Sequence, residues 1–104
     1  KTIKTDQKRI IEFENVKIDL NKLKIIKNKK EFKINNTEKI ILEKMINNPG
    51  NTFSREQIGE LINLDKERSI DVIITRLRKK IEIDPKNPKF LQTIRGAGYV
   101  LWIE

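Results

Sequence analysis

The chain has 104 residues, the length of one domain, and is long enough to bury a core of its own. It contains neither cysteine nor histidine, which excludes disulfides and thiolate nucleophiles and removes the commonest metal ligand and general base; we therefore expect no enzyme, metal site or cofactor. A net charge of +8 favours a polyanionic partner, nucleic acid or an acidic membrane surface, although AT-rich coding also produces abundant Lys, Ile and Asn.

The ends of the chain and its hydropathy bear on its location. No apolar run approaches the ~20 residues that span a bilayer, and no signal peptide opens the chain, so we expect a cytoplasmic protein that does not bind membranes. Residues 1–9 are polar and basic and are expected to form a linker or tail ahead of one domain over residues 10–104. Because the sequence begins at Lys1 rather than Met, we expect it to be part of a longer chain.

Residues 10–34 predict an antiparallel meander of short strands. Apolar residues alternate with charged ones in parts of this region, and asparagines, which favour tight turns, fall between the apolar stretches. One face of the sheet should therefore be solvated, and the other needs helices packed against it. The predicted strands are Ile10–Phe13, Val16–Leu20, Leu23–Ile26 and Glu31–Ile34.

Two helices with capping boxes are predicted next. Asn35 and Glu38 have the capping-box spacing ahead of a helix over 36–47, which Asn48-Pro49-Gly50 ends. Ser54 and Gln57 repeat that spacing ahead of a helix over 55–62, with a brief extended pairing at Phe53 before it. The residues expected to be buried are Ile41, Leu42, Met45, Ile46, Ile58, Leu61 and Ile62.

A third helix is predicted over residues 67–83, after a short connection at 63–66, and it has two different faces. Ile70, Ile74, Leu77 and Ile81 recur at the spacing of a buried stripe, and Asp84-Pro85 stops the helix. A face that combines basic, hydroxyl and aliphatic side chains suits a DNA major groove, and a solvated basic surface is the alternative. The residues of this face are Ser69, Val72, Ile73, Arg76, Lys79 and Lys80, with Arg78 at its edge.

The C-terminal residues predict a hairpin. Its strands are predicted over residues 90–95 and 99–103, and its turn at Gly96-Ala97-Gly98. Tyr99 and Trp102 are expected to pack in the core or sheet. This order is typical of a winged helix-turn-helix: two helices joined by a short connection, the second of them basic, and then a hairpin. The expected fold class is therefore α+β: an N-terminal four-stranded antiparallel sheet, three helices and a C-terminal β-hairpin wing.

The ordered motifs resemble the C-terminal winged-helix effector domain of OmpR/PhoB response regulators, over about residues 10–103. The matching segments are 54–58, 68–72, 76–81, Asp84-Pro85 and 92–99. The resemblance implies the output domain of a bacterial two-component transcriptional regulator, with the third helix in the major groove and the wing in the minor groove. It also implies head-to-tail pairing on tandem direct repeats, promoted by an N-terminal receiver domain that this chain is too short to contain; we expect the isolated domain to be monomeric.

Base contacts are assigned on the third helix. Arg76 lies at its middle and can bond a guanine edge bidentately, so we expect it to be the main base-contacting residue. Val72 and Ile73 are expected to meet thymine methyls, or else to pack against the hairpin or a neighbouring turn. Asp71 matches a family position that accepts from cytosine, and an ion pair with a nearby Arg is the alternative. Ser69, near the helix start, is expected to reach a base or a phosphate.

Phosphate and wing contacts complete the predicted site. Arg95, next to Gly96, is placed to enter a narrow minor groove from the wing, or is a surface strand residue. Thr75 falls at a position where many members of the OmpR/PhoB family carry a basic residue. This domain is therefore expected to make one charged contact with DNA fewer at that position. Phosphate contacts, which position without specifying, are expected from Arg68, Arg78, Lys79, Lys80, Ser54 and Thr93, although capping and strand propensity explain the last two nearly as well.

Two other functions compete with DNA binding. The basic face would equally dock on an acidic protein partner, with Val72 and Ile73 as a small apolar anchor. An enzyme is disfavoured because no catalytic set is present and the acids near residues 65–71 are typical of a helix start. The connection at 63–67 is shorter than the corresponding family loop that touches RNA polymerase, so we do not assign polymerase contact to it, and RNA polymerase stays a candidate partner through another surface.

Overall fold

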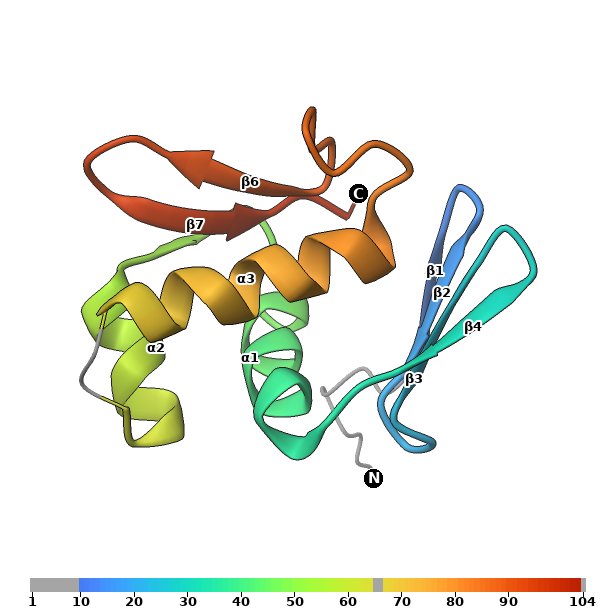
Figure 1. Ribbon diagram of the computed structural model, residues 1–104, viewed down its shortest axis with the longest axis horizontal. Coiled ribbons are helices and arrows are strands. Elements are labelled where there is room, and N and C mark those ends of the chain that lie inside the picture. Colours follow the sequence, from blue (N-terminus) through green and yellow to red (C-terminus); the bar gives the residue numbers. More distant parts are fainter. Residues whose placement is uncertain (1–9, 65–66, 104) are drawn as a thin grey trace, which may run out of the picture.

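Three helices pack against two antiparallel sheets in the computed structural model, which describes residues 10–64 and 67–103 (Figure 1). The first sheet contains, in sequence order, β1 (Ile10–Phe13), β2 (Val16–Asp19), β3 (Lys24–Lys27) and β4 (Lys30–Lys33). The helices are α1 (Asn36–Ile46), α2 (Arg55–Ile62) and α3 (Glu67–Ile81). The second sheet has the order β5-β7-β6 and contains β5 (Thr52–Phe53), β6 (Leu91–Ile94) and β7 (Gly98–Leu101). The expected α+β winged helix-turn-helix is confirmed.

Two expectations lie outside the described residues. One is the linker or tail over residues 1–9, and the other is the conformation of residues 65–66, in the connection that bears on polymerase contact. Before that gap, Asn63 has a left-handed φ of 57°, and the Leu64 amide donates to the Gly59 carbonyl at 2.9 Å. Helix α2 therefore ends in a left-handed C-cap of the kind that Asn favours.

Several strand ends differ from the predicted ones by one residue. Asn28 and Lys29 have φ values of 51° and 70°, and they form a two-residue turn that pairs Lys27 with Lys30. Strand β3 therefore runs on to Lys27, and β4 begins already at Lys30. Leu23, predicted to begin β3, has a φ of 55° and belongs to the preceding turn. The wing strands β6 and β7 are also shorter than predicted, and β7 begins at Gly98, a residue predicted for the turn. Trp102, expected to pack in the core or sheet, follows β7 and is 46% exposed.

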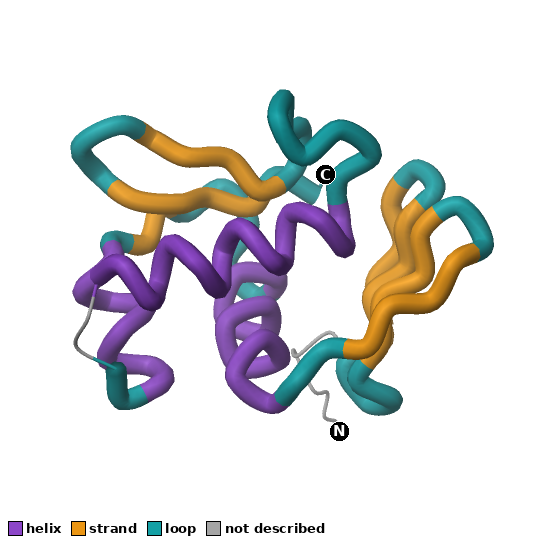
Figure 2. Tube along the Cα trace, in the orientation of Figure 1, coloured by secondary structure: helices purple, strands orange, loops and turns teal. Residues whose placement is uncertain are grey.

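The core lies between α3, α1 and the inner faces of both sheets. In Figure 2, α3 crosses in front of the upper end of α1 and below the wing, and its C-terminal end approaches the first sheet. The predicted stripe on α3 is confirmed, since each of its four isoleucine and leucine side chains is at most 1% exposed. Helix α2 is less deeply buried than predicted: Ile58 is buried, whereas Leu61 and Ile62 are half-buried. Burial of these side chains is the main stabilising term of the fold.

The end of α3 is held by two charged side chains that the sequence did not single out. The Glu82 carboxylate is 1% exposed and accepts hydrogen bonds from the backbone amides of Lys89 (2.7 Å), Phe90 (3.0 Å) and Leu91 (2.7 Å). The Lys27 ammonium donates to two carbonyls at the helix C-terminus, Lys79 O at 2.8 Å and Glu82 O at 2.7 Å. Helix α3 therefore stops at Ile81 rather than at residue 83.

Candidate nucleic-acid interface

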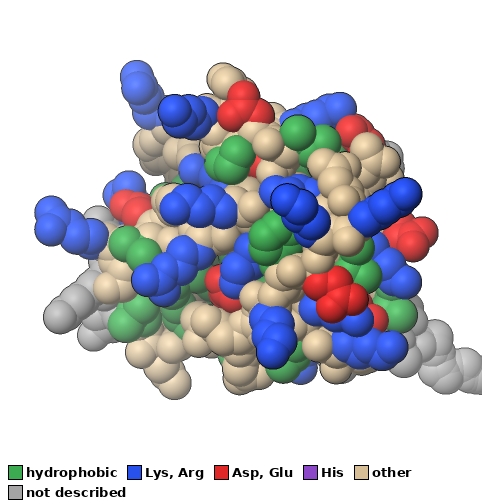
Figure 3. Space-filling view, turned by 45° about the vertical axis from the view of Figure 1, so that its right-hand side comes forward, with side chains coloured by type: hydrophobic (Ala, Val, Ile, Leu, Met, Phe, Trp, Pro, Cys, Tyr) green, Lys and Arg blue, Asp and Glu red, His purple; other side chains and the backbone are tan. Residues whose placement is uncertain are grey.

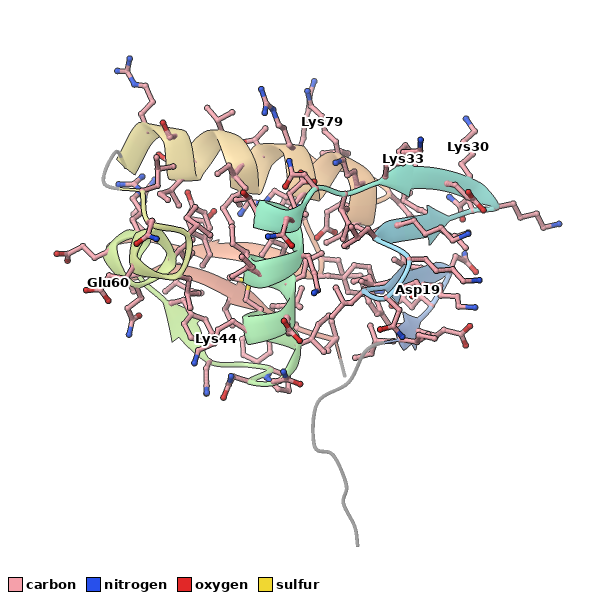
Figure 4. All side chains as sticks on the ribbon, turned by 90° about the horizontal axis from the view of Figure 1, so that it is seen from below. Asp19, Lys30, Lys33, Lys44, Glu60 and Lys79 are labelled. Atoms are coloured by element: carbon pink, nitrogen blue, oxygen red, sulfur yellow. The ribbon has the colours of Figure 1, made fainter. Side chains whose placement is uncertain are left out.

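One face of α3 is turned away from the rest of the chain. Spacings of three, four and three residues place four side chains along one line of the helix, opposite the buried stripe: Ser69, Val72, Arg76 and Lys79. Val72 is 43% exposed, Arg76 and Lys79 are exposed, and Figure 4 shows Lys79 projecting from the helix into solvent. Within the described part of the chain, the Arg76 and Lys79 side chains make no hydrogen bond or ion pair.

The neighbouring positions of α3 divide between this exposed face and the core. Arg68, one turn before Val72, is exposed and without a partner among residues 10–64 and 68–103, so it extends the basic face towards the helix start. Ile73 is half-buried and packs against the hydrophobic core. Thr75 is exposed and donates its hydroxyl to the Asp71 carbonyl at 2.8 Å. Of the two aliphatics predicted for the exposed face, the structure therefore leaves only Val72 in the open.

The Asp71 carboxylate links α3 to α2 and to the wing. It accepts from the Arg55 guanidinium Nε at 2.9 Å and from the Tyr99 hydroxyl. Burial by itself would raise the pKa of Asp71. The hydrogen bonds from Tyr99 and Arg55, together with the positive charges of Arg55 and Arg78, outweigh burial, so the pKa of Asp71 is lowered. Burial and the bond to Asp71 raise the pKa of Tyr99. The ion-pair alternative for Asp71 is thus present, and it includes a tyrosine that was expected only to pack.

Arg78 fastens the wing to α3. Its Nε donates to the Leu91 carbonyl at 2.8 Å, its Nη2 donates to the Thr93 hydroxyl, and its guanidinium lies 5.6 Å from the centre of the Tyr99 ring. Arg78 and Thr93, both predicted to contact phosphates, are thereby brought together in one internal contact between α3 and β6. Because this contact fixes the hairpin on the helix, it sets the angle between the exposed face of α3 and the wing.

Lys80 is also engaged within the chain. Its ammonium donates to both carboxylate oxygens of Glu38, at 2.9 and 3.1 Å, and to the Lys33 carbonyl at 2.7 Å. Glu38 is 2% exposed and also completes the predicted capping box of α1 by accepting from the Asn35 amide at 3.0 Å. A buried carboxylate needs a cation beside it. Lys80 supplies that charge, and at the same time joins α3 to the first sheet and to α1.

A hollow of about 250 Å³ separates the start of α2 from the wing, and Ser54, Thr93 and Gly96 are among the residues that line it. Ser54 forms the predicted capping box: its hydroxyl accepts from the Gln57 amide at 3.1 Å, and the Gln57 side chain accepts from the Ser54 amide at 2.8 Å. Gly96, with a φ of +79°, and exposed Arg95 form the tip of the wing. The two predicted wing residues therefore face away from the core.

Gly98 brings the wing close to the helix-turn-helix. Its φ is +141°, and a Cβ there would stand 2.1 Å from the Phe53 carbonyl oxygen. This close approach lets β7 pair with β5, with Phe53 opposite Tyr99, which confirms the brief extended pairing predicted at Phe53. Only glycine combines this conformation with this lack of space.

Residues 29–101 match the family of the C-terminal domain of transcriptional regulatory proteins. The chain belongs to this family. It is 40% identical over 97 residues to the probable transcriptional regulator ycf27 of Guillardia theta, covering 88% of this chain and 38% of that protein. Response regulator DrrB, an OmpR/PhoB homologue from Thermotoga maritima, has a similar structure, with a TM-score of 0.80 and 31% identity over 91% of this chain and 45% of DrrB.

The DNA-binding domain of response regulator AdeR, solved in complex with an intercistronic region, is similar with a TM-score of 0.66 and 28% identity over 90% of this chain and all of that domain. The chain is thus an effector domain of OmpR/PhoB type, a transcriptional regulator domain and not an enzyme. It spans less than half the length of ycf27 and of DrrB. No helix in the described part of this effector domain is long and apolar enough to cross a membrane.

Proposed function

We propose that this effector domain binds duplex DNA sequence-specifically, with α3 in the major groove and the β6–β7 wing at the adjacent minor groove. The observation that carries the proposal is the exposed face of α3, where Arg76 and Lys79 have no partner in the described chain and Val72 is 43% exposed. Arg donors and an aliphatic side chain are suited to guanine edges and thymine methyls. The complex of the similar AdeR domain with an intercistronic region supports the same function here.

The residue roles follow from which side chains are committed inside the chain. We assign base contact to Arg76, Val72 and Ser69, and phosphate contact to Arg68, Lys79 and Ser54. Arg95 at the wing tip is assigned to the minor groove, where Gly96 provides the turn. Asp71, Arg78, Thr93 and Lys80 are assigned to positioning, because each already bonds another element of the domain.

The domain is further proposed to act as the output domain of a cytoplasmic two-component response regulator. Its receiver domain would promote head-to-tail pairing of two copies on tandem direct repeats, while the isolated domain is monomeric. Two domains bound in the same orientation would each contact one copy of the same half-site. The spacing and orientation of repeats in the bound DNA therefore test this pairing.

Selection of bound fragments from random duplexes at moderate salt tests the function. We expect one enriched motif, and repeats of that motif in the same orientation when two domains bind together. Recovery of fragments without any enriched motif would contradict sequence-specific binding. It would favour the rival function, in which the basic face with Val72 docks on an acidic protein.

A further inference from the structure

The β3–β4 hairpin holds a large share of the positive charge. Residues 24–33 contain five lysines and one glutamate, so ten residues carry +4 of the chain's net charge of +8. The hairpin lies outside the helix-turn-helix and the wing (Figure 1). Figure 3, which brings this side of the molecule forward, shows Lys and Arg side chains spread over the face, with fewer acidic ones among them.

Four of the five lysines of the hairpin fall into two groups, and the fifth, Lys24, is paired with Glu31. Lys27 is used internally, since it donates to the C-terminal carbonyls of α3 and lies 5.2 Å from the centre of the Phe32 ring. Lys29, Lys30 and Lys33 are exposed, and their side chains make no hydrogen bond or ion pair within the described residues. The bonds of Lys27 to α3 therefore fix the position of the hairpin backbone that carries the three exposed lysines.

A second contact makes that placement rigid. The Lys80 ammonium of α3 bonds the backbone carbonyl of Lys33 at 2.7 Å, next to the exposed Lys33 side chain. The hairpin is therefore attached to the last turns of α3 at β3 through Lys27 and at β4 through Lys80. The backbone that carries the exposed lysines is therefore in place before it meets a ligand, so that only the lysine side chains lose conformational freedom on binding.

The acidic residues near the exposed lysines are already paired with other cations. Glu31, the only acid of the hairpin, bonds the Lys24 ammonium at 3.2 Å. Glu38, close to the end of β4, is buried and bonds Lys80. The positive charges of Lys30 and Lys33 are therefore not compensated by either neighbour.

The exposed lysines of β4 lie on the same side of the molecule as the proposed DNA-binding face. In Figure 4, Lys30, Lys33 and Lys79 stand along one edge of the view, whereas Lys44 of α1 lies on the opposite side. With a rise of about 1.5 Å per residue, the exposed face from Ser69 to Lys79 is about 15 Å long. Lys79 is the end of that face beside the hairpin, because its backbone carbonyl accepts from the Lys27 ammonium at 2.8 Å.

We propose that the β3–β4 hairpin, through Lys30 and Lys33, binds backbone phosphates of the duplex next to the base pairs that α3 contacts. The proposal rests on the proposed DNA binding and enlarges the footprint of the domain on one flank. These contacts carry no sequence information and add affinity that depends on salt.

The test compares the wild-type domain with the Lys30→Gln/Lys33→Gln variant on the selected duplex, in a short form limited to the motif and a long form extended by one helical turn on both sides. We expect the long form to bind the wild type more tightly than the short form, and the variant to lose that difference. The slope of log affinity against log salt on the long form should fall by about 1.8 in the variant, on the order of a tenfold change between about 50 and about 200 mM salt.

Lys44→Gln is the control for the loss of an exposed lysine charge on the opposite side, and we expect it to leave the slope unchanged. The proposal would be overturned if the double variant still bound the long duplex more tightly than the short one by the wild-type margin, or if its salt slope equalled that of the wild type. Loss of binding to phosphatidylserine vesicles with unchanged binding to the duplex would also overturn it. If no motif is selected by the wild type, the proposed function fails and this inference fails with it.

Discussion

Arg76 can be replaced without disturbing the fold, because its side chain has no partner in the described part of the chain. We expect Arg76→Ala to weaken binding to the selected duplex by about 1–3 kcal/mol and to relax one base position, as loss of a bidentate guanine contact would. Thermal stability should change by less than about 0.5 kcal/mol. Gel-shift titrations against single-base variants of the motif measure the first effect, and thermal melts measure the second. Unchanged affinity and preference would remove Arg76 from the base contacts.

Asp71 is expected to act on stability rather than on base choice. Its pKa in the folded state is lowered, so its contribution is complete above its ordinary pKa and is lost as the pH falls through the folded value. Because Asp71 is only half-buried, Asp71→Asn should cost about 1 kcal/mol near pH 7, and the difference from the wild type should shrink below about pH 4.

Urea unfolding of both proteins over a range of pH gives this comparison. The same variant should keep the base preference of the wild type in a duplex selection. A relaxed preference at a cytosine, with stability that is equal at every pH, would return Asp71 to the base contacts.

At the scale of elements, the loop between α3 and the wing depends on one carboxylate. Replacing Glu82 by Gln leaves a single acceptor oxygen and a buried NH₂ group facing three backbone donors. We expect Glu82→Gln to destabilise the domain by about 1–3 kcal/mol, a decrease in Tm of about 4 °C or more for a domain of this size. Glu60→Gln, at an exposed position of α2 seen in Figure 4, is the control and should melt like the wild type.

For the whole molecule, sequence patterns were sufficient where the signal is local or periodic. The isoleucine stripe of α3 and the two capping boxes each depend on residues within a few positions of one another, and all are present. The wing turn is present too, but one residue earlier than predicted, because Gly98 already pairs with Ile94. The observed ends of β3 and β4 differ from the predicted ones because two non-glycine residues, Asn28 and Lys29, adopt positive φ and form a two-residue turn. Periodicity alone does not fix such a register.

Contacts between distant segments could not be predicted in this way. Lys80 meets Glu38, 42 positions away, and Lys27 meets Lys79 O, 52 positions away. In the sequence, Lys27 and Lys80 cannot be told apart from the exposed lysines. Only the packed fold shows which lysines hold elements together and which are free to bind a ligand. The same holds for Arg78, which helical spacing places at the edge of the basic face and which the fold turns towards Thr93.

The close approach of Gly98 to Phe53 divides the wing into two parts that tolerate sequence change differently. At its base, a Cβ on residue 98 would collide with the Phe53 carbonyl, so substitution of Gly98 would push the hairpin away from the helices. At its tip, a Cβ on Gly96 would meet no atom within 4 Å, although its φ of +79° favours glycine or asparagine, and Arg95 and Ala97 are exposed. New specificities of the wing can therefore evolve at the tip, one exposed side chain at a time, while the base keeps the fold.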